Sequence, residues 1–212
     1  MFFVSGCPHG SVNRGPMEIP YSTEPRPDTG ATNAQIGMWL FLGSEVMLFG
    51  ALFSAYALLR MDADNWPVPG TYTDVRLGGV NTLVLIGSTI AAFAATRAAQ
   101  AGERARAARL VLLTTLAGLI FLGIKSFEWH AKMEHGVVPG TNMFLALYFT
   151  MTGLHAFHVL AGLIAYFWWL GPGAGIGRRE PARDAQRLRV TGYYWAFVDV
   201  IWLLMFPIFY LF

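Results

Sequence analysis

The chain contains 212 residues, of which 55% are hydrophobic and only 13% are charged. A soluble domain usually carries about 25% charged residues. Here the charges cluster in short segments between long apolar runs, which is typical of a protein surrounded by lipid. The net charge of +2 is too small to indicate nucleic-acid binding, and the single cysteine, Cys7, excludes an intramolecular disulfide.

Five apolar segments are long enough to cross a bilayer, which requires about 20 helical residues. In chain order they span residues 35–59, 77–96, 110–129, 143–170 and 190–212. Residues 1–33 contain glycine, proline, serine, threonine and charged residues without periodicity, so we expect a mobile cytoplasmic tail there. The predicted fold is an all-α integral membrane protein in which residues 34–212 form one five-transmembrane-helix bundle.

Arginine is concentrated in two of the connections between these segments. The second-to-third and fourth-to-fifth connections lie on the same side of a five-helix bundle and contain Arg97, Arg104, Arg106, Arg109, Arg178, Arg179, Arg183, Arg187 and Arg189. The alternate connections are poor in arginine and lysine. Because loops rich in these residues stay in the cytoplasm, the sequence predicts a cytoplasmic N-terminus and a C-terminus on the outer side.

Four ionisable side chains lie far inside the predicted spans: Glu45, His155, His158 and Asp199. At about 1.5 Å per residue, Glu45 and Asp199 lie ~14–15 Å from the cytoplasmic starts of their helices, and the histidines ~18–23 Å from the outer start of theirs. An ionisable group at this depth is costly unless it is partnered. We therefore predict one buried layer in which these groups satisfy each other's hydrogen bonds. Glu45 is expected to hold a proton there at neutral pH, because an apolar medium favours the uncharged carboxyl.

A second polar cluster is predicted near the outer surface. Asn81 begins the second apolar segment, and Lys125, Glu128 and His130 end the third. Lys125 and Glu128 are three residues apart and can form an ion pair on one helix face. Such a cluster is typical of a structural clasp between helices rather than of a catalytic site.

Three interpretations of the inner layer are open on residue chemistry. Haem or copper ligation is disfavoured, because the only other histidines are His9 in the tail and His130 and His135 at the outer end. A proton path or ion-coupled transporter is disfavoured by the lack of internal repeats and broken helices. The third interpretation, polar contacts that fix helix packing, is the commonest outcome and is compatible with a regulatory proton on Glu45. We therefore predict no catalytic, metal-binding or cofactor-binding residue in this chain.

Motifs in all five segments resemble subunit III of the haem-copper terminal oxidases, which comprise cytochrome c oxidases and quinol oxidases. The resemblance covers residues 34–212 in order. It is carried by MWLFLGSEVMLFGALFSAY (38–56), Asn81-Thr82, Phe127-Glu128-Trp129, TGLHAFHVLAG (152–162) and YYWAFVDVIWLLMFPIFYL (193–211). The chain is similar to the five-helix bacterial form, since the two additional N-terminal helices of larger members are missing.

The resemblance implies a subunit of the bacterial cytoplasmic membrane that binds no haem or copper itself. Family members pack beside catalytic subunit I in a complex that also contains subunit II, hold phospholipid in a cleft and assist proton delivery. They also protect the catalytic centre from inactivation during turnover. The family's buried, carbodiimide-reactive glutamate corresponds to Glu45, its paired histidines to His155 and His158, its last-helix aspartate to Asp199, and its outer glutamate to Glu128. Ala196 stands where many members have histidine, so no function is inferred from that position.

The expected function is that of a non-redox accessory subunit of an aerobic oxidase that reduces oxygen to water and pumps protons. Its electron donor would be cytochrome c or a quinol. One alternative is a subunit III-like partner of a nitric oxide reductase, and another is a small proton-coupled membrane transporter.

Overall fold

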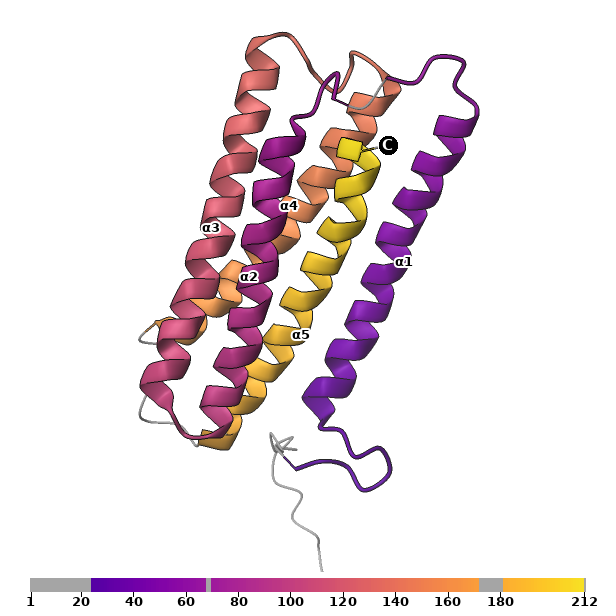
Figure 1. The fold of residues 1–212 in the computed structure, drawn as a ribbon. Helices are drawn as coiled ribbons and strands as arrows, with labels where there is room; N and C mark the ends of the chain where they lie inside the picture. The colour runs from indigo at the N-terminus through magenta and orange to yellow at the C-terminus, as the bar shows by residue number, and fades with distance from the viewer. Residues whose placement is uncertain (1–23, 68–69, 172–180, 212) are drawn as a thin grey trace, which may run out of the picture.

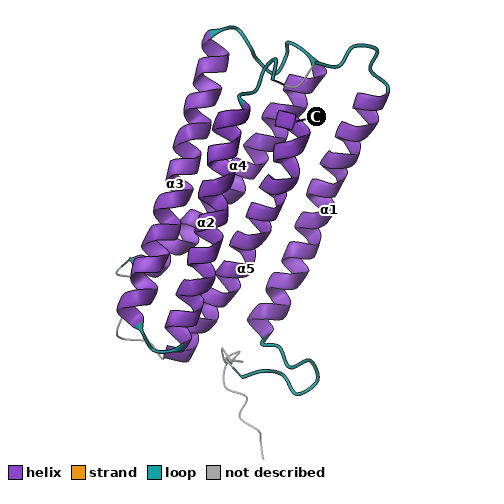
Figure 2. Ribbon diagram, in the orientation of Figure 1, coloured by secondary structure: helices purple, strands orange, loops and turns teal. Residues whose placement is uncertain are grey.

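Five long helices account for most of the computed structural model, which describes residues 24–67, 70–171 and 181–211. They are α1 (Asn33–Met61), α2 (Val75–Gln100), α3 (Arg104–Glu134), α4 (Met143–Leu170) and α5 (Pro181–Phe206). Successive helices alternate in direction, and the described residues contain no strand (Figures 1 and 2). All five are long and apolar enough to cross a membrane, which confirms the predicted five-helix membrane fold.

Side-chain caps set the starts of three of these helices. Thr32 and Gln35 form a reciprocal capping box at the start of α1, and the side chain of Asn142 accepts from the backbone N–H of Leu145 at 2.8 Å at the start of α4. Asp74 caps α2 by accepting from the N–H of Arg76 at 2.8 Å. Residues 24–32 form turns before α1, whereas residues 1–23 of the predicted tail lie outside the described residues.

The helices extend beyond the apolar segments that predicted them. α3 begins at Arg104 rather than near Leu110, and α5 begins at Pro181 rather than near Val190. A charged turn outside the hydrocarbon can continue a helix, because only the membrane-spanning part must be apolar. The α2–α3 connection is consequently a tight turn in which Gly102 adopts a φ of 77°, a conformation that favours glycine.

The last predicted helix ends in a π-helical turn, η2 (Pro207–Leu211), rather than in regular α-helix. Pro207 lacks an N–H group and its ring crowds the preceding turn, which explains the change of helical pitch. Two side chains from other elements bond backbone carbonyls of this turn: Tyr56 Oη donates to Ile208 O at 3.2 Å, and Thr73 Oγ1 donates to Phe209 O at 2.9 Å. These bonds fix the C-terminal turn against α1 and the α1–α2 connection.

The packing centre of the bundle is Trp195 of α5, which is fully buried. Its Nε1 donates to Ser88 Oγ of α2 at 2.8 Å. Its ring lies directly against Gly118 of α3 and Gly162 of α4, so α5 meets three neighbours through one side chain. Small residues permit this close approach. α1 lies at the edge of the bundle and packs mainly on α5 and α4 (Figure 1).

Charge is segregated between the two ends of the bundle. The end that holds the start of α1, the α2–α3 turn and the start of α5 is called the arginine-rich end here. It carries Arg97, Arg104, Arg106, Arg109, Arg183, Arg187 and Arg189. Arg178 and Arg179 lie outside the described residues. The C-terminus lies at the opposite end (Figure 1).

Candidate functional site

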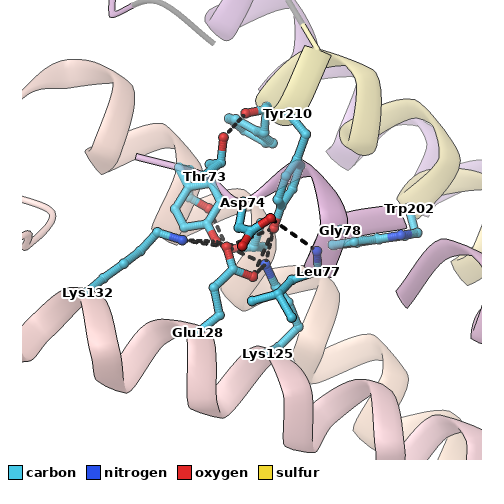
Figure 3. A network of polar contacts seen from close by, with 12 residues as sticks. Thr73, Asp74, Leu77, Gly78, Lys125, Glu128, Lys132, Trp202 and Tyr210 are labelled. Atoms are coloured by element: carbon cyan, nitrogen blue, oxygen red, sulfur yellow. Dashed lines mark hydrogen bonds and ion pairs between the residues drawn. The ribbon is translucent and has the colours of Figure 1, made fainter. Parts of the chain in front are cut away.

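A buried ionic cluster, which Figure 3 shows from close by, lies at the end of the bundle opposite the arginine-rich end. We call it the Glu128 cluster; its members are Lys125, Glu128 and Lys132 of α3, Tyr148 of α4 and Tyr210 of η2. The three α3 residues recur at helical spacing, so their side chains leave the helix on one face. The cluster therefore joins α3 to the two elements that pack against this face.

Glu128 is the shared acceptor of the cluster. One carboxylate oxygen accepts from Lys125 Nζ at 3.0 Å, and the other accepts from Lys132 Nζ and from Tyr148 Oη, the latter at 2.8 Å. Tyr210 Oη lies 3.0 Å from both oxygens. The Glu128 side chain is only 5% exposed. Four protein donors therefore take the place of the water molecules that would hydrate this carboxylate in solution.

Lys125 is equally well satisfied. Its Nζ donates to Glu128 at 3.0 Å, to Tyr148 Oη at 3.0 Å and to Tyr210 Oη at 2.8 Å, which uses all three ammonium protons. The same ammonium lies 5.1 Å from the ring of Trp202, within cation–π range. A fully bonded cluster of this kind holds helices together and leaves no donor of Lys125 for a ligand.

The structure brings together two of the four residues predicted for the outer cluster. The Lys125–Glu128 ion pair is present, but Asn81 is fully buried elsewhere and neither of its side-chain polar atoms has a partner among the described residues. His130 points away from the cluster: its side chain is 70% exposed and lies 3.2 Å from Glu134. Two residues along a helix turn the side chain by roughly 200°, which places His130 on the far side of α3 from Glu128.

Sequence reasoning missed three members of the cluster. Lys132 carried a usable signal, since it lies four residues after Glu128 on the same helix face. Tyr148 and Tyr210 carried none, because tyrosine near a helix end is also typical of the membrane interface.

A second polar contact joins α1 to α4. His158 Nε2 lies 2.9 Å from Glu45 Oε2, and His158 Nδ1 lies 2.7 Å from the carbonyl of Leu154. A carbonyl only accepts, so Nδ1 carries a proton and donates it. Nε2 then either accepts a proton from Glu45 or donates one to it, so one proton lies between these two side chains.

The prediction that Glu45, His155, His158 and Asp199 form one hydrogen-bonded layer is wrong, because only Glu45 and His158 bond each other. Asp199 of α5 accepts from Thr89 of α2 through one oxygen, and its other oxygen has no partner among the described residues. His155 has no hydrogen-bond partner in the described chain either; its ring packs against those of Phe121 and Trp202, with centroids 5.5 and 5.4 Å away. His155 and His158 differ by roughly 60° around α4, so His158 faces α1 while His155 faces the interior.

An open groove lies between α1, α4 and α5 at the arginine-rich end. Its volume is about 410 Å³, and its lining comes from α1, α4 and α5: Ala34, Ala161, Ile164, Ala165, Trp168, Trp169, Arg187, Val190 and Thr191. The guanidinium of Arg187 lies 5.1 Å from the ring of Trp168. The groove thus combines apolar walls with one cationic group near the membrane surface. Within the described ranges, no group of three or more histidine, cysteine, aspartate or glutamate side chains could hold a metal ion.

Substitutions at Glu45 and Asp199 are expected to differ in effect. Glu45→Gln should leave assembly close to wild type, since the amide can still bond His158. Asp199→Leu should destabilise the chain by about 1–3 kcal/mol, because it leaves the half-buried Thr89 hydroxyl without its acceptor. Thermal midpoints and yields after detergent extraction measure both effects, with Asp199→Asn as the matched control. Equal stability of Glu45→Gln and Asp199→Leu would contradict this ranking.

Comparison with known proteins gives consistent matches along the chain. The sequence profile of a family described as cytochrome c oxidase subunit III matches residues 28–212. A probable cytochrome c oxidase subunit 3 of Mycobacterium tuberculosis is 33% identical over 176 residues, covering 82% of this chain and 86% of the relative. A heme-copper oxidase subunit I+III of Aeropyrum pernix is 30% identical, covering 82% of this chain and 22% of that protein. A cytochrome bo(3) ubiquinol oxidase subunit 3 of Pseudomonas aeruginosa is 29% identical, covering 92% and 91% of the two chains.

Proposed function

Because the chain belongs to the cytochrome c oxidase subunit III family and is an accessory subunit of a haem-copper oxidase, we propose that its own role is non-redox. It stabilises catalytic subunit I, supports proton uptake and binds phospholipid. Oxygen reduction to water and the coupled proton pumping take place in its partners, which hold the haem and copper. The chain works in the bacterial cytoplasmic membrane as a multi-pass protein.

The observation that carries the non-redox role is the way the buried charges are used. Lys125, Glu128 and Lys132 bond each other and two tyrosines, and Glu45 bonds His158. The two tyrosines join α3 to α4 and to η2, and the Glu45–His158 bond joins α1 to α4. Groups that fix packing in this way stabilise a scaffold, which is what an accessory subunit contributes.

The partners of the chain are subunits I and II of the oxidase. The Aeropyrum pernix relative is named subunit I+III, so its name joins both subunits in one chain. This supports direct contact between subunits I and III. The electron donor of the complex is cytochrome c or a quinol, since relatives of both kinds of oxidase match the chain.

The proton-holding role belongs to Glu45 with His158. One proton lies between them, and their side chains are 14% and 10% exposed, so the pair is within reach of a neighbouring subunit or of water. A proton that is held but not sealed off can exchange, as a supporting role in proton uptake requires.

Phospholipid is assigned to the groove between α1, α4 and α5. Its walls suit acyl chains, while Arg187 suits a phosphate. The arginine-rich end faces the cytoplasm on the positive-inside rule, which leaves the Glu128 cluster and the C-terminus on the outer side.

Purification of the complex from a strain with an affinity tag on this chain tests the role. We expect a haem-copper subunit I to co-purify with the tagged chain. In membranes of a strain that lacks this chain, oxygen reduction should lose activity faster during turnover. The tagged chain alone should show no haem absorbance. Co-purification of a nitric oxide-reducing subunit with non-haem iron, a Soret band in the isolated chain, or substrate uptake by this chain alone in liposomes would each overturn the proposal.

A further inference from the structure

A second groove lies on the exposed face of the α2–α3 helix pair, at the arginine-rich end of the bundle. Its volume is about 600 Å³, and its lining comes from α2 and the start of α3: Ile90, Phe93, Ala94, Arg97, Ala98, Ala101, Glu103 and Arg106. None of these residues lines the α1–α4–α5 groove or belongs to the Glu128 cluster. The groove is therefore a separate feature of the surface.

The α2 side of this groove is one stripe of the helix. Ile90, Phe93, Ala94 and Arg97 recur at helical spacing and share a face. Ile90 and Phe93 are 66% and 42% exposed although both are large and apolar. From Ile90 to Arg97 the stripe rises ~10 Å. An arginine at headgroup level would therefore place Ile90 in the adjoining part of the hydrocarbon.

The polar end of the groove carries excess positive charge. Among the described residues, the Arg97 guanidinium has neither an ion-pair nor a hydrogen-bond partner. Arg106 pairs with Glu103 at 3.0 Å, but these side chains are 64% and 49% exposed, so the pair is well hydrated and weak. Two guanidinium groups against one carboxylate leave a net charge of +1 at the mouth of the groove.

We propose that this groove binds one anionic phospholipid, with its phosphate between Arg97 and Arg106 and an acyl chain along Phe93 and Ile90. The ligand must be amphipathic, because the cationic end and the exposed apolar stripe belong to the same groove. An acidic peptide or free phosphate would satisfy the arginines but leave the apolar stripe uncovered. A zwitterionic lipid would cover the stripe but leave the positive charge unmatched.

Photo-crosslinking of the purified oxidase complex tests the site. The complex is reconstituted in phosphatidylcholine nanodiscs that contain phosphatidylglycerol with a diazirine on its acyl chain, and adducts are mapped by peptide mass spectrometry. We expect adducts within residues 90–98. They should fall by about fivefold in Arg97→Gln and further in Arg97→Gln/Arg106→Gln, since each basic residue near an anionic surface contributes about this factor.

Arg76→Gln is the matched control, because Arg76 is an exposed arginine at the other end of the same helix; it should leave the adducts unchanged. Diazirine-labelled phosphatidylcholine should label residues 90–98 less than the anionic lipid does, and added inorganic phosphate should not compete. Equal labelling by both lipids, no loss in the double variant, or full competition by phosphate would overturn the proposal. So would crosslinks from this stripe to another subunit. Recovery of subunit I is measured in the same preparations, so failed assembly with the oxidase is distinguished from failed lipid binding.

Discussion

Replacement of Glu128 by leucine is expected to destabilise the chain by about 3–5 kcal/mol, because it leaves two buried ammonium groups without their carboxylate. Lys125 is 3% exposed, and the side chain of Lys132 is 10% exposed, so water cannot replace the lost partner. Thermal denaturation of the detergent-solubilised protein, followed by circular dichroism, measures the loss. We expect a large fall in the midpoint and poor recovery of the variant from membranes.

Two further variants separate burial from charge in this effect. Glu103→Leu removes one partner of the exposed Arg106 ion pair and should cost no more than about 1 kcal/mol. The triple variant Glu128→Leu/Lys125→Met/Lys132→Met removes all three charges and should recover most of the lost stability, since a buried ion cluster can often be replaced by apolar side chains. A triple variant as unstable as Glu128→Leu alone would contradict the charge-based explanation.

Alanine at Gly118 or at Gly162 is expected to destabilise the bundle by about 1–3 kcal/mol at each position, and the double variant should lose more than either. A Cβ at Gly118 would lie 2.7 Å from the Trp195 ring, and one at Gly162 would lie 2.8 Å from it. Trp195 is 0% exposed and bonded to Ser88, so its indole has no free space to move into. The same thermal midpoint measures the effect.

Gly123→Ala is the control for this prediction, because it adds a methyl group to α3 at a position with nothing within 4 Å of the new carbon. It should leave the midpoint unchanged. Trp195→Phe should partly rescue Gly118→Ala, since the new methyl would overlap with the outer indole atoms that phenylalanine lacks. If Gly123→Ala and Gly118→Ala proved equally harmful, loss of glycine itself and not overlap with Trp195 would be the cause.

The number and placement of the helices could be predicted because lipid imposes a simple requirement on sequence. A spanning segment must be apolar over about 20 residues and must satisfy its own backbone hydrogen bonds. The helix ends could not be predicted in the same way. The arginines at the start of α3 and the residues before Val190 are helical in water-exposed turns, where the apolar requirement no longer applies.

Polar partners could be predicted only where both lie on one helix. The Lys125–Glu128 pair follows from three-residue spacing along α3, and Lys132 could have been added on the same ground. The contact of Glu45 with His158 agrees with the depths estimated from the sequence, but depth says nothing about which way a side chain faces. His155 illustrates this: it lies deep in a predicted span, yet it meets none of the partners that depth suggested.

The sequence by itself determined that this protein is a five-helix membrane bundle of the subunit III family, because hydropathy and motif order are properties of the chain alone. The tertiary structure alone decided which buried groups meet: Glu128 with two lysines and two tyrosines, Glu45 with His158, and Trp195 against Gly118 and Gly162. The physical reason is that partner choice depends on the rotation of each helix about its axis. That rotation is fixed by close packing between helices, to which every residue on the contacting faces contributes.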